Sequence, residues 1–410
     1  MNIYKDLQTQ IQELCKGGLC SDDNLKHIIH PDRVIEINIP VKMDNWSTQN
    51  FVGYRSQHSD IRGPYKWGIR FHPNVSKNEV MALSTWMSIK TAVVDLPLWW
   101  WKWGVIVNPK KLSKNELEKL SRWYVRKIYK YLWANSDVPA PDVNTNWEIM
   151  AWMMDEYSNL VGSYTPGSFT WKPLEAWGSK WRSVATAKWW MYVFETYLKY
   201  INDEIKDKKI VLQWAGNVWL NFAKMLYDKW ANIVAISDSS GWVYDEKGLD
   251  MYKIVELKSS WKSVIDYNAK QITNKQLLEL DTEVLVLAAL EDQINNKNKE
   301  SIRANYILEL ANGPISKNAI EYLEEQNVPV IPDILANAGG VTVSYFEQVQ
   351  NSMNYYWGEK EIFDKLKNIM VKASDDILRY ADDNSLTYRK AAFNIAIERI
   401  LKTMKSRKNI

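Results

Sequence analysis

A nucleotide-binding pattern lies in the second half of the chain, where residues 209–238 are typical of a strand, a turn, a helix and a second strand. The turn has the sequence Trp214-Ala215-Gly216-Asn217-Val218-Trp219 and directly follows the apolar run KIVLQ. If Trp214 and Trp219 are read as glycine it becomes GAGNVG. This is the G-x-G-x-x-G pattern, in which backbone groups at a helix N-terminus hold a pyrophosphate.

An acid after the second strand bears on the choice of dinucleotide. Asp238 follows the motif by about 20 residues. A carboxylate at this position accepts a hydrogen bond from the ribose 2′-hydroxyl and so favours NAD over NADP. The same residue equally well begins the turn SDSSG. Ser239 and Ser240 offer hydroxyls to a phosphate. The sequence therefore predicts NAD or NADP, with NAD slightly favoured.

Cationic and acid–base side chains are spaced along the first half, at Lys66, Lys90, Lys102 and Asp142. Cationic side chains can hold the carboxylates of a substrate, and a lysine or aspartate can act as an acid–base group beside a bound nicotinamide. Lysines that lie close together repel, which lowers a pKa toward neutrality. Taken singly, a lysine is usually a solvated surface charge and an aspartate next to proline is usually a turn residue.

The tryptophans occupy positions that ask for glycine. The chain has 22 Trp and 16 Gly, whereas average usage predicts roughly 29 glycines. Trp46 lies in a two-residue hairpin turn that favours Asn-Gly, and Trp230 follows a helix where glycine is common. The tract Trp99-Trp100-Trp101-Lys102-Trp103-Gly104 would read GGGKGG. We infer that most tryptophans are glycines encoded by UGA, a codon that some genetic codes read as Trp and others as Gly. Trp86, Trp152 and Trp357 lie in apolar helical contexts and are expected to be genuine.

The elements that must position these residues fall into two domains. Residues 33–57 predict a hairpin, 66–73 and 92–97 further strands, and 137–146 a loop, with helices between them. From 209 the β/α alternation and short buried strands predict a doubly wound, Rossmann-type parallel sheet. We expect an α/β protein with a substrate-binding domain over 1–184, completed by C-terminal helices 345–410, and a dinucleotide-binding domain over 185–344.

Composition excludes several classes of protein. Hydrophobic residues are 46% and charged residues 25%, as in ordinary globular proteins and unlike disordered ones. A net charge of +3 gives no reason to expect a nucleic-acid or membrane partner. Two cysteines and four histidines support neither a disulfide framework nor a metal site. No apolar run reaches the ~18 residues of a membrane span, and no secretory signal is visible, so a cytoplasmic location is expected.

Read with glycine at these tryptophans, the chain resembles the glutamate/leucine/phenylalanine/valine dehydrogenases, and glutamate dehydrogenase in particular. The resemblance runs from about residue 35 to about 400. It rests on matching strings in the same order: KWGIRFHP, MSIKTAVVDLPLWWWKWGVIV, PAPDVNTNWEIMAWMMDEYS, SVATAKWW, VLQWAGNVW, ANGP and PDILANAGGVTVSYFE.

The resemblance assigns roles to individual residues. It implies that Lys66, helped by Ser344, binds the side-chain carboxylate of glutamate and that Lys90 binds the α-carboxylate. Lys102 would activate the attacking water, and Asp142 would shuttle protons. The other substrate-binding positions it implies are Met87, Gly340 and Val341. The other cofactor-binding positions it implies are Thr186, Trp214, Ala215, Gly216, Asn217, Val218, Trp219, Asp238 and Asn312.

The implied reaction interconverts glutamate with 2-oxoglutarate and ammonia in a homohexamer. Two alternatives stay open. A sister dehydrogenase for branched or aromatic amino acids would need an apolar pocket in place of Lys66 and Ser344. A catalytically inactive, Trp-rich binding protein is the other, if the tryptophans are literal. Ser344 alone could simply cap a helix.

Overall fold

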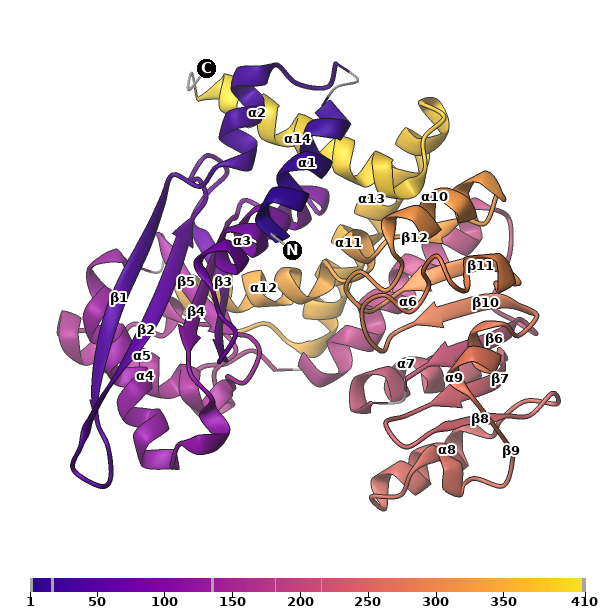
Figure 1. The fold of residues 1–410 in the computed structure, drawn as a ribbon, viewed down its shortest axis with the longest axis horizontal. Helices are drawn as coiled ribbons and strands as arrows, with labels where there is room; N and C mark the ends of the chain where they lie inside the picture. Colours follow the sequence, from indigo (N-terminus) through magenta and orange to yellow (C-terminus); the bar gives the residue numbers. More distant parts are fainter. Residues whose placement is uncertain (1–2, 16–17, 134–135, 181, 215, 408–410) are drawn as a thin grey trace. The chain divides into compact units, whose positions relative to one another are not determined.

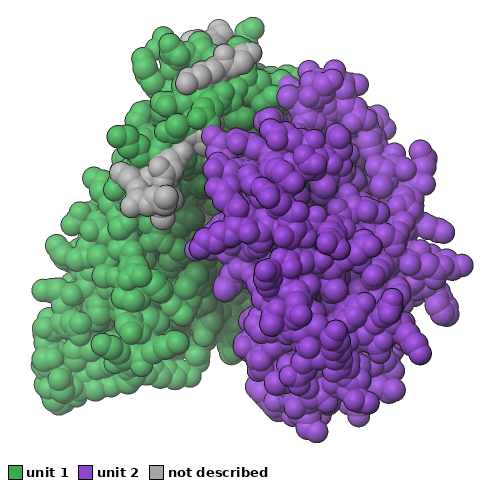
Figure 2. Space-filling model, turned by 45° about the vertical axis from the view of Figure 1, so that its right-hand side comes forward, with its two compact units in different colours: residues 1–180, 341–362, 393–410 green, residues 181–340, 363–392 purple. Residues whose placement is uncertain are grey.

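In a computed structural model the chain forms two compact units, coloured separately in Figure 2. The structure describes residues 3–15, 18–133, 136–180, 182–214 and 216–407. Unit 1 comprises residues 1–180, 341–362 and 393–410, and unit 2 comprises 181–340 and 363–392. The sequence predicted that helices 345–410 return to the first domain. Residues 363–392 instead belong to unit 2, where Tyr200 hydrogen-bonds Asp382 and Arg389 pairs with Glu309.

Unit 1 is built on a five-stranded mixed sheet of order β1-β2-β4-β3-β5. β1 and β2 form the predicted antiparallel hairpin, and β3 lies parallel to both β4 and β5. Its strands are β1 (Arg33–Lys42), β2 (Thr48–Gln57), β3 (Tyr65–His72), β4 (Trp99–Ile106) and β5 (Asp137–Pro141). Its helices are α1 (Ile3–Cys15), α2 (Asp22–Ile29), α3 (Lys77–Val93), α4 (Lys114–Ile128) and α5 (Trp147–Val161). Most of α12 (Gly339–Met353) and most of α14 (Tyr388–Ser406) also belong to unit 1.

The two faces of this sheet are covered by different helices (Figure 1). Neighbouring residues of a strand point to opposite faces. Ser56 of β2 hydrogen-bonds Ser84 of α3 at 2.9 Å, so Ser56 faces α3. Arg55 stacks on Trp103, whose ring packs on Tyr124 of α4. Because Ser56 pairs with Lys102 in register, Lys102 points to the face that α3 covers.

Two predicted elements of unit 1 were wrong. Residues 92–97 are not a strand, because α3 continues to Val93 and the chain then turns through Asp95 at φ 51°. The strand that follows is β4, formed by the tract around Lys102. The predicted loop at 137–146 begins as strand β5, because Tyr65 to Ile69 of β3 offer it a parallel edge.

Unit 2 has the predicted doubly wound sheet, with seven strands in the order β12-β11-β10-β6-β7-β8-β9. The strands from β12 to β7 pair in parallel. β8 pairs antiparallel with β7, and β9 pairs antiparallel with β8. The strands are β6 (Lys209–Gln213), β7 (Asn232–Ser237), β8 (Trp242–Tyr244), β9 (Lys270–Ile272), β10 (Thr282–Leu287), β11 (Ala304–Glu309) and β12 (Val330–Ile331). The strand order reverses beside β6, the place where such sheets bind ligands.

The helices of unit 2 connect the strands of this sheet and follow its last strand. They are α6 (Arg182–Tyr200), α7 (Asn217–Asp228), α8 (Met251–Ser259), α9 (Asn274–Leu278), α10 (Lys317–Glu325), α11 (Asp333–Ala336) and most of α13 (Glu359–Asp383). The sheet core is almost wholly aliphatic, with Val211, Val234, Leu285 and Ile307 each at most 1% exposed. Such near-continuous apolar strands are typical of a parallel sheet buried on both faces.

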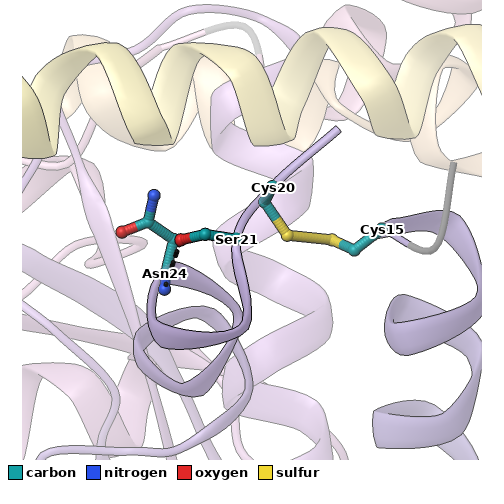
Figure 3. The surroundings of a disulfide bond; sticks show 4 residues. All are labelled: Cys15, Cys20, Ser21 and Asn24. Atoms are coloured by element: carbon teal, nitrogen blue, oxygen red, sulfur yellow. Dashed lines mark hydrogen bonds between the residues drawn. A yellow bond between two sulfur atoms is a disulfide. The ribbon is translucent and has the colours of Figure 1, made fainter. Parts of the chain in front are cut away.

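The two cysteines form a disulfide between the end of α1 and the residue before the N-cap of α2 (Figure 3). Cys15 and Cys20 are five residues apart in sequence, with Cα atoms 5.3 Å apart. The adjacent Ser21 caps α2 by accepting a hydrogen bond from the Asn24 N–H at 3.3 Å. The prediction that two cysteines support no disulfide framework therefore missed one local crosslink.

Among the residues that the structure describes, six tryptophans have left-handed backbone conformations, with φ between 58° and 102°. They are Trp46, Trp171, Trp177, Trp214, Trp230 and Trp261. Positive φ is an outlier for a bulky residue and costs roughly 1–2 kcal/mol relative to the right-handed region. Trp46, Trp214 and Trp230 are positions where the sequence had predicted a backbone that favours glycine.

Candidate active site

The buried Lys102 and the half-buried Asp142 form an ion pair on the face of the unit 1 sheet that α3 covers. Lys102 extends from β4, and Asp142 directly follows β5. The loop holds Asp142 firmly: its N–H donates to Thr145 Oγ1 at 2.8 Å, and the Thr145 hydroxyl donates to the Ile69 carbonyl at 2.8 Å. The structure thus brings together the two residues that the sequence predicted as proton carriers.

Gly68 of β3 makes this approach possible. A Cβ at Gly68 would lie 2.7 Å from the Asp142 Cβ and 2.9 Å from the Pro141 carbonyl oxygen. A Cβ atom, which forms no hydrogen bond, cannot pack at such distances from carbon or carbonyl oxygen. The glycine therefore clears the space over β3 that Asp142 uses to reach Lys102.

Arg70 is a further member of the site that the sequence reasoning did not single out. Its Nε donates to Asp142 Oδ2 at 3.2 Å, and its Nη1 donates to Glu79 of α3. Arg70 and Lys66 have the same parity on β3, which puts both on the Lys102 face. Arg70 lies in the matching string KWGIRFHP. Because side chains alternate between the faces of a strand, its spacing of four residues from Lys66 could have indicated that it belongs to the site.

Burial and opposite charges set the proton affinities of the pair. Burial lowers the pKa of Lys102 more than Asp142 raises it, and the Arg70 charge adds to the lowering. Burial alone would raise the pKa of Asp142, but the charges of Lys102 and Arg70 outweigh it and hold that pKa below its usual value. The direction predicted for Lys102 is confirmed, but its cause is burial and Arg70 rather than neighbouring lysines.

Lys66 and Ser344 meet through a third residue, Thr170. The fully buried Lys66 ammonium donates to Thr170 Oγ1 and, at 3.2 Å, to the Val138 carbonyl oxygen. Thr170 Oγ1 lies 2.9 Å from Ser344 Oγ. Burial lowers the pKa of Lys66 to about 7. An ammonium beside two hydroxyls inside the protein is suited to hold a carboxylate.

The other residues predicted to bind substrate lie on α3 and α12. Met87 and Lys90 are half-buried in α3, which covers the Lys102 face. Val341 is buried one turn before Ser344 on α12, and Gly340 precedes it. Their roles in binding remain predictions.

Trp103 does not line this site. Trp103 is fully buried on the opposite face, where its ring lies 5.2 Å from the Tyr124 ring. Alternation along β4 separates it from Lys102.

The backbone around the glycine-like motif of unit 2 fits a dinucleotide. β6 ends at Gln213, Trp214 turns the chain at φ 102°, and Gly216 is the N-cap of α7 with no side-chain cap. The Trp214 N–H donates to Ser237 Oγ at 2.8 Å. The N-terminal N–H groups of such a helix can hold a phosphate. An indole at 214 does not fit, because the backbone there must approach the pyrophosphate closely.

Other predicted cofactor residues are placed as follows. Ala215 lies outside the described residues; Asn217, Val218 and Trp219 form the first turn of α7. Thr186 is half-buried in α6, and Asn312 is exposed in the turn after β11. The adjacent Gly313 adopts φ 57° and donates its N–H to Asp333 at 2.9 Å.

Asp238 is fully engaged by its own unit. Its carboxylate accepts hydrogen bonds from Lys258 Nζ at 2.7 Å, the Ser240 N–H at 2.9 Å and the Val264 N–H at 3.0 Å. Ser263 Oγ lies 2.9 Å and 3.1 Å from its two oxygens. These donors fill the roughly four lone-pair positions of a carboxylate. The turn role of Asp238 is thus observed, and its ribose role stays a prediction.

The described part of the chain contains no group of His, Cys, Asp and Glu side chains that could hold a metal ion. Within the same residues, no helix has the length and apolar character needed to cross a membrane.

Comparison with known proteins gives a consistent result over both units. The model of the Glu/Leu/Phe/Val dehydrogenase dimerisation domain matches residues 31–159, and the model of the glutamate/leucine/phenylalanine/valine dehydrogenases matches residues 178–408. The catabolic NAD-specific glutamate dehydrogenase of Bacillus subtilis is 42% identical over 399 residues, 97% of this chain and 94% of that protein. The NAD-specific glutamate dehydrogenase of Staphylococcus aureus is 42% identical over 403 residues, 97% of each.

Solved structures agree with these relatives. The glutamate dehydrogenase of Peptoniphilus asaccharolyticus superposes with a TM-score of 0.91 at 37% identity, over 100% of both chains. The hetero-hexameric glutamate dehydrogenase of Thermus thermophilus, in a leucine-bound form, superposes with a TM-score of 0.88 at 30% identity. It covers 98% of this chain and 97% of its own.

Proposed function

The chain belongs to the glutamate/leucine/phenylalanine/valine dehydrogenase family, and we propose that it is an NAD-dependent glutamate dehydrogenase. It interconverts L-glutamate, NAD+ and water with 2-oxoglutarate, ammonia, NADH and a proton. The observation that carries the choice of substrate is the buried Lys66–Thr170–Ser344 cluster. Leucine or phenylalanine would place an apolar side chain against the buried Lys66 ammonium and supply no carboxylate to pair with its charge, which is costly for a buried charge.

The residues of unit 1 divide the remaining chemistry between them. When bound, the nicotinamide accepts the hydride that leaves the glutamate α-carbon. Lys102, with its lowered pKa, takes a proton from the water that attacks the resulting imine. Asp142, in contact with Lys102 and Arg70, carries protons between that water and the departing ammonia. Lys90 holds the α-carboxylate.

The experiment that tests this function compares substrates with purified protein that carries glycine at Trp214 and at the other positions inferred to be UGA-encoded glycines. NAD reduction is followed with L-glutamate, L-leucine, L-phenylalanine and L-valine, and again with NADP. Glutamate with NAD is expected to give the highest kcat/KM. Preference for leucine, phenylalanine or valine would identify a sister dehydrogenase, and no turnover of any of them would refute the proposal.

We also propose that most tryptophans are glycines in the natural protein, decoded from UGA. Six left-handed tryptophans support it, because a glycine adopts these conformations without steric cost. Three of them are strongly exposed: Trp46 is 80%, Trp230 76% and Trp261 99% exposed. Trp214 interrupts a backbone that otherwise fits a dinucleotide.

The tryptophans expected to be genuine are placed differently. Trp86 lies in α3 with its ring 5.4 Å from the Phe393 ring, and Trp357 lies 5.5 Å from Phe346. Mass spectrometry of a peptide spanning residues 96–107, from the native organism, tests the idea. Glycine at 99, 100, 101 and 103 is expected, with UGA codons there and UGG codons at 86, 152 and 357. Tryptophan at all four positions would refute recoding.

A hexamer of identical chains in the cytoplasm completes the proposal. The Thermus thermophilus relative is described as a hetero-hexamer, and the family model for residues 31–159 is a dimerisation domain. Mass photometry of the purified protein is expected to give six times the chain mass. A dimeric or monomeric mass would refute the hexamer and leave the proposed reaction untouched.

A further inference from the structure

A second buried ion pair, between Lys172 and Glu347, lies beside the Lys66 cluster in unit 1. Both residues are 0% exposed, and Lys172 Nζ lies 2.8 Å from Glu347 Oε1. The ammonium also donates to the Phe169 carbonyl oxygen at 2.6 Å. Burying two charges is expensive unless they are paired and hydrogen-bonded. Such a pair is therefore a specific feature of this site and not a surface contact.

The backbone of segment 169–172 also binds the Glu347 carboxylate. The Trp171 N–H donates to Oε2 at 2.9 Å, and the Lys172 N–H donates to Oε1 at 3.4 Å. Two successive N–H groups form an anion-binding concavity when the chain takes a left-handed turn, and Trp171 has φ 66°. The Glu347 carboxylate thus binds both the Lys172 side chain and the backbone N–H groups of segment 169–172.

Thr170 lies inside this fixed segment, and Ser344 lies one helical turn before Glu347 on α12. Residues three apart on a helix share a face. The pair therefore sets the register between segment 169–172 and α12, which is the register that places Thr170 Oγ1 at 2.9 Å from Ser344 Oγ. We propose that Lys172 and Glu347 are positioning residues for the side-chain carboxylate of the substrate, holding Thr170 against Lys66 and Ser344. The proposal deepens the proposed function, since it takes that substrate to be glutamate.

The pair also acts on Lys66 through charge. Among the described residues, the charged groups that act on Lys66 are Glu347 from α12 and Lys172 from segment 169–172. Burial lowers the pKa of Lys66, Glu347 raises it and Lys172 lowers it. The carboxylate of glutamate binds the protonated ammonium, so kcat/KM falls as pH rises through the pKa of Lys66. Removing each charge must move this alkaline limb in a different direction.

The test uses Glu347→Gln, Lys172→Met and Lys172→Arg in the full-length enzyme. Each of the first two variants is expected to raise the KM for glutamate at least about tenfold while kcat stays within about threefold, because binding contacts are lost and the reacting centre is kept. The alkaline limb should move to lower pH in Glu347→Gln and to higher pH in Lys172→Met. Lys172→Arg keeps the charge and should restore most of the affinity. Glu156→Gln, which removes another buried carboxylate of unit 1 from its contacts with Arg122 and Arg126, should change neither value.

Two substrates separate positioning from a general structural role. L-Norvaline has no side-chain carboxylate, so its kcat/KM should stay within about threefold in all variants. Glutarate binding, measured by calorimetry over the same pH range, should follow the glutamate pattern without any turnover. Limbs that move the same way in both charge-removing variants, or equal losses for norvaline and glutamate, would overturn the proposal. Failure of the parent enzyme on glutamate would refute the proposed function alone, because glutarate binding still reports on the pair.

Discussion

The carboxylate of Asp142 reaches the ammonium of Lys102 over the backbone of β3. It crosses β3 at Gly68, which has no side chain to block the approach. β3 lies between β4 and β5 in the sheet, so the two partners come from strands that do not touch. The register pairs Lys66 with Trp100 and Ile69 with Trp103, which places Gly68 level with Lys102. The contact of the proposed acid–base pair thus depends on a missing Cβ.

Gly68→Ala tests this dependence. The new Cβ would lie 2.7 Å from the Asp142 Cβ, so the aspartate must move away from Lys102. We expect kcat to fall at least about 10²-fold, the usual scale of an acid–base contribution, with little change in NAD binding by fluorescence titration. Gly358→Ala is the matched control, since a Cβ there meets nothing within 4 Å. Unaltered turnover in Gly68→Ala would show that the Lys102–Asp142 contact is dispensable.

Asp142→Asn probes the proton-carrying role with almost no change of shape. An amide cannot shuttle the protons that water addition and ammonia release require, so kcat should fall at least about 10²-fold. Loss of the carboxylate also removes a charge that raises the pKa of Lys102, so any residual activity should extend to lower pH. Asp155→Asn removes an exposed partner of Arg122 and is the control. Near-normal turnover in Asp142→Asn would leave Lys102 as the remaining candidate proton carrier.

The specificity of the Lys66 cluster is tested by replacing its polar groups. In Lys66→Leu with Ser344→Val, glutamate turnover should fall and the relative use of leucine and norvaline should rise, because the substrate carboxylate is then buried without a cation. Lys26→Leu, a change of a 68% exposed lysine, should leave the ratio unchanged. If the glutamate-to-leucine ratio of kcat/KM does not move, Lys66 and Ser344 do not hold the side-chain carboxylate.

How far the sequence predicts this site depends on whether a residue acts through local pattern or through distant contact. The Trp46 hairpin turn and the strand–turn–helix around Trp214 are local signals, and the structure has both features. Thr170 is 104 residues from Lys66 and 174 from Ser344, and nothing in its own neighbourhood marks it. Lys172 and Glu347 were missed for the same reason, since each alone has the pattern of a surface charge.

The wrong prediction at residues 92–97 and the still open role of Asp238 both depend on contacts that the local sequence does not show. Residues 92–97 are apolar and short, a pattern that strands and buried helix ends share. Tertiary packing of Leu96 and Leu98 decides between them, and both are at most 3% exposed. For Asp238, position after the strand indicated a ribose contact, whereas Lys258 and Ser263, 20 and 25 residues later, occupy its oxygens.

Asp238→Asn distinguishes those two roles. The carboxylate has a folded-state pKa below its usual value, where Lys258 and the N–H donors outweigh burial. It therefore contributes stability that is present above about pH 4 and is lost as pH falls through the lower folded pKa. The variant should lose about 1–3 kcal/mol at neutral pH and less at acid pH, with a small change in the NAD to NADP ratio of kcat/KM. A large loss of NAD affinity with an unchanged melting temperature would instead support the ribose contact.

Single tryptophan substitutions test recoding through stability, without activity and without the native organism. In the chain expressed with tryptophan at every position, Trp230→Gly should raise the free energy of unfolding by about 1 kcal/mol, because a left-handed residue loses its steric strain. Trp230 is 76% exposed, so little packing is lost. Trp86→Gly should lower the free energy of unfolding by about 3–5 kcal/mol, the range for removing a large aromatic side chain from a packed site. The reason is that the Trp86 ring packs against the Phe393 ring. Urea denaturation followed by circular dichroism measures both. Destabilisation by Trp230→Gly and Trp86→Gly alike would mean that the fold uses its exposed left-handed tryptophans as tryptophans.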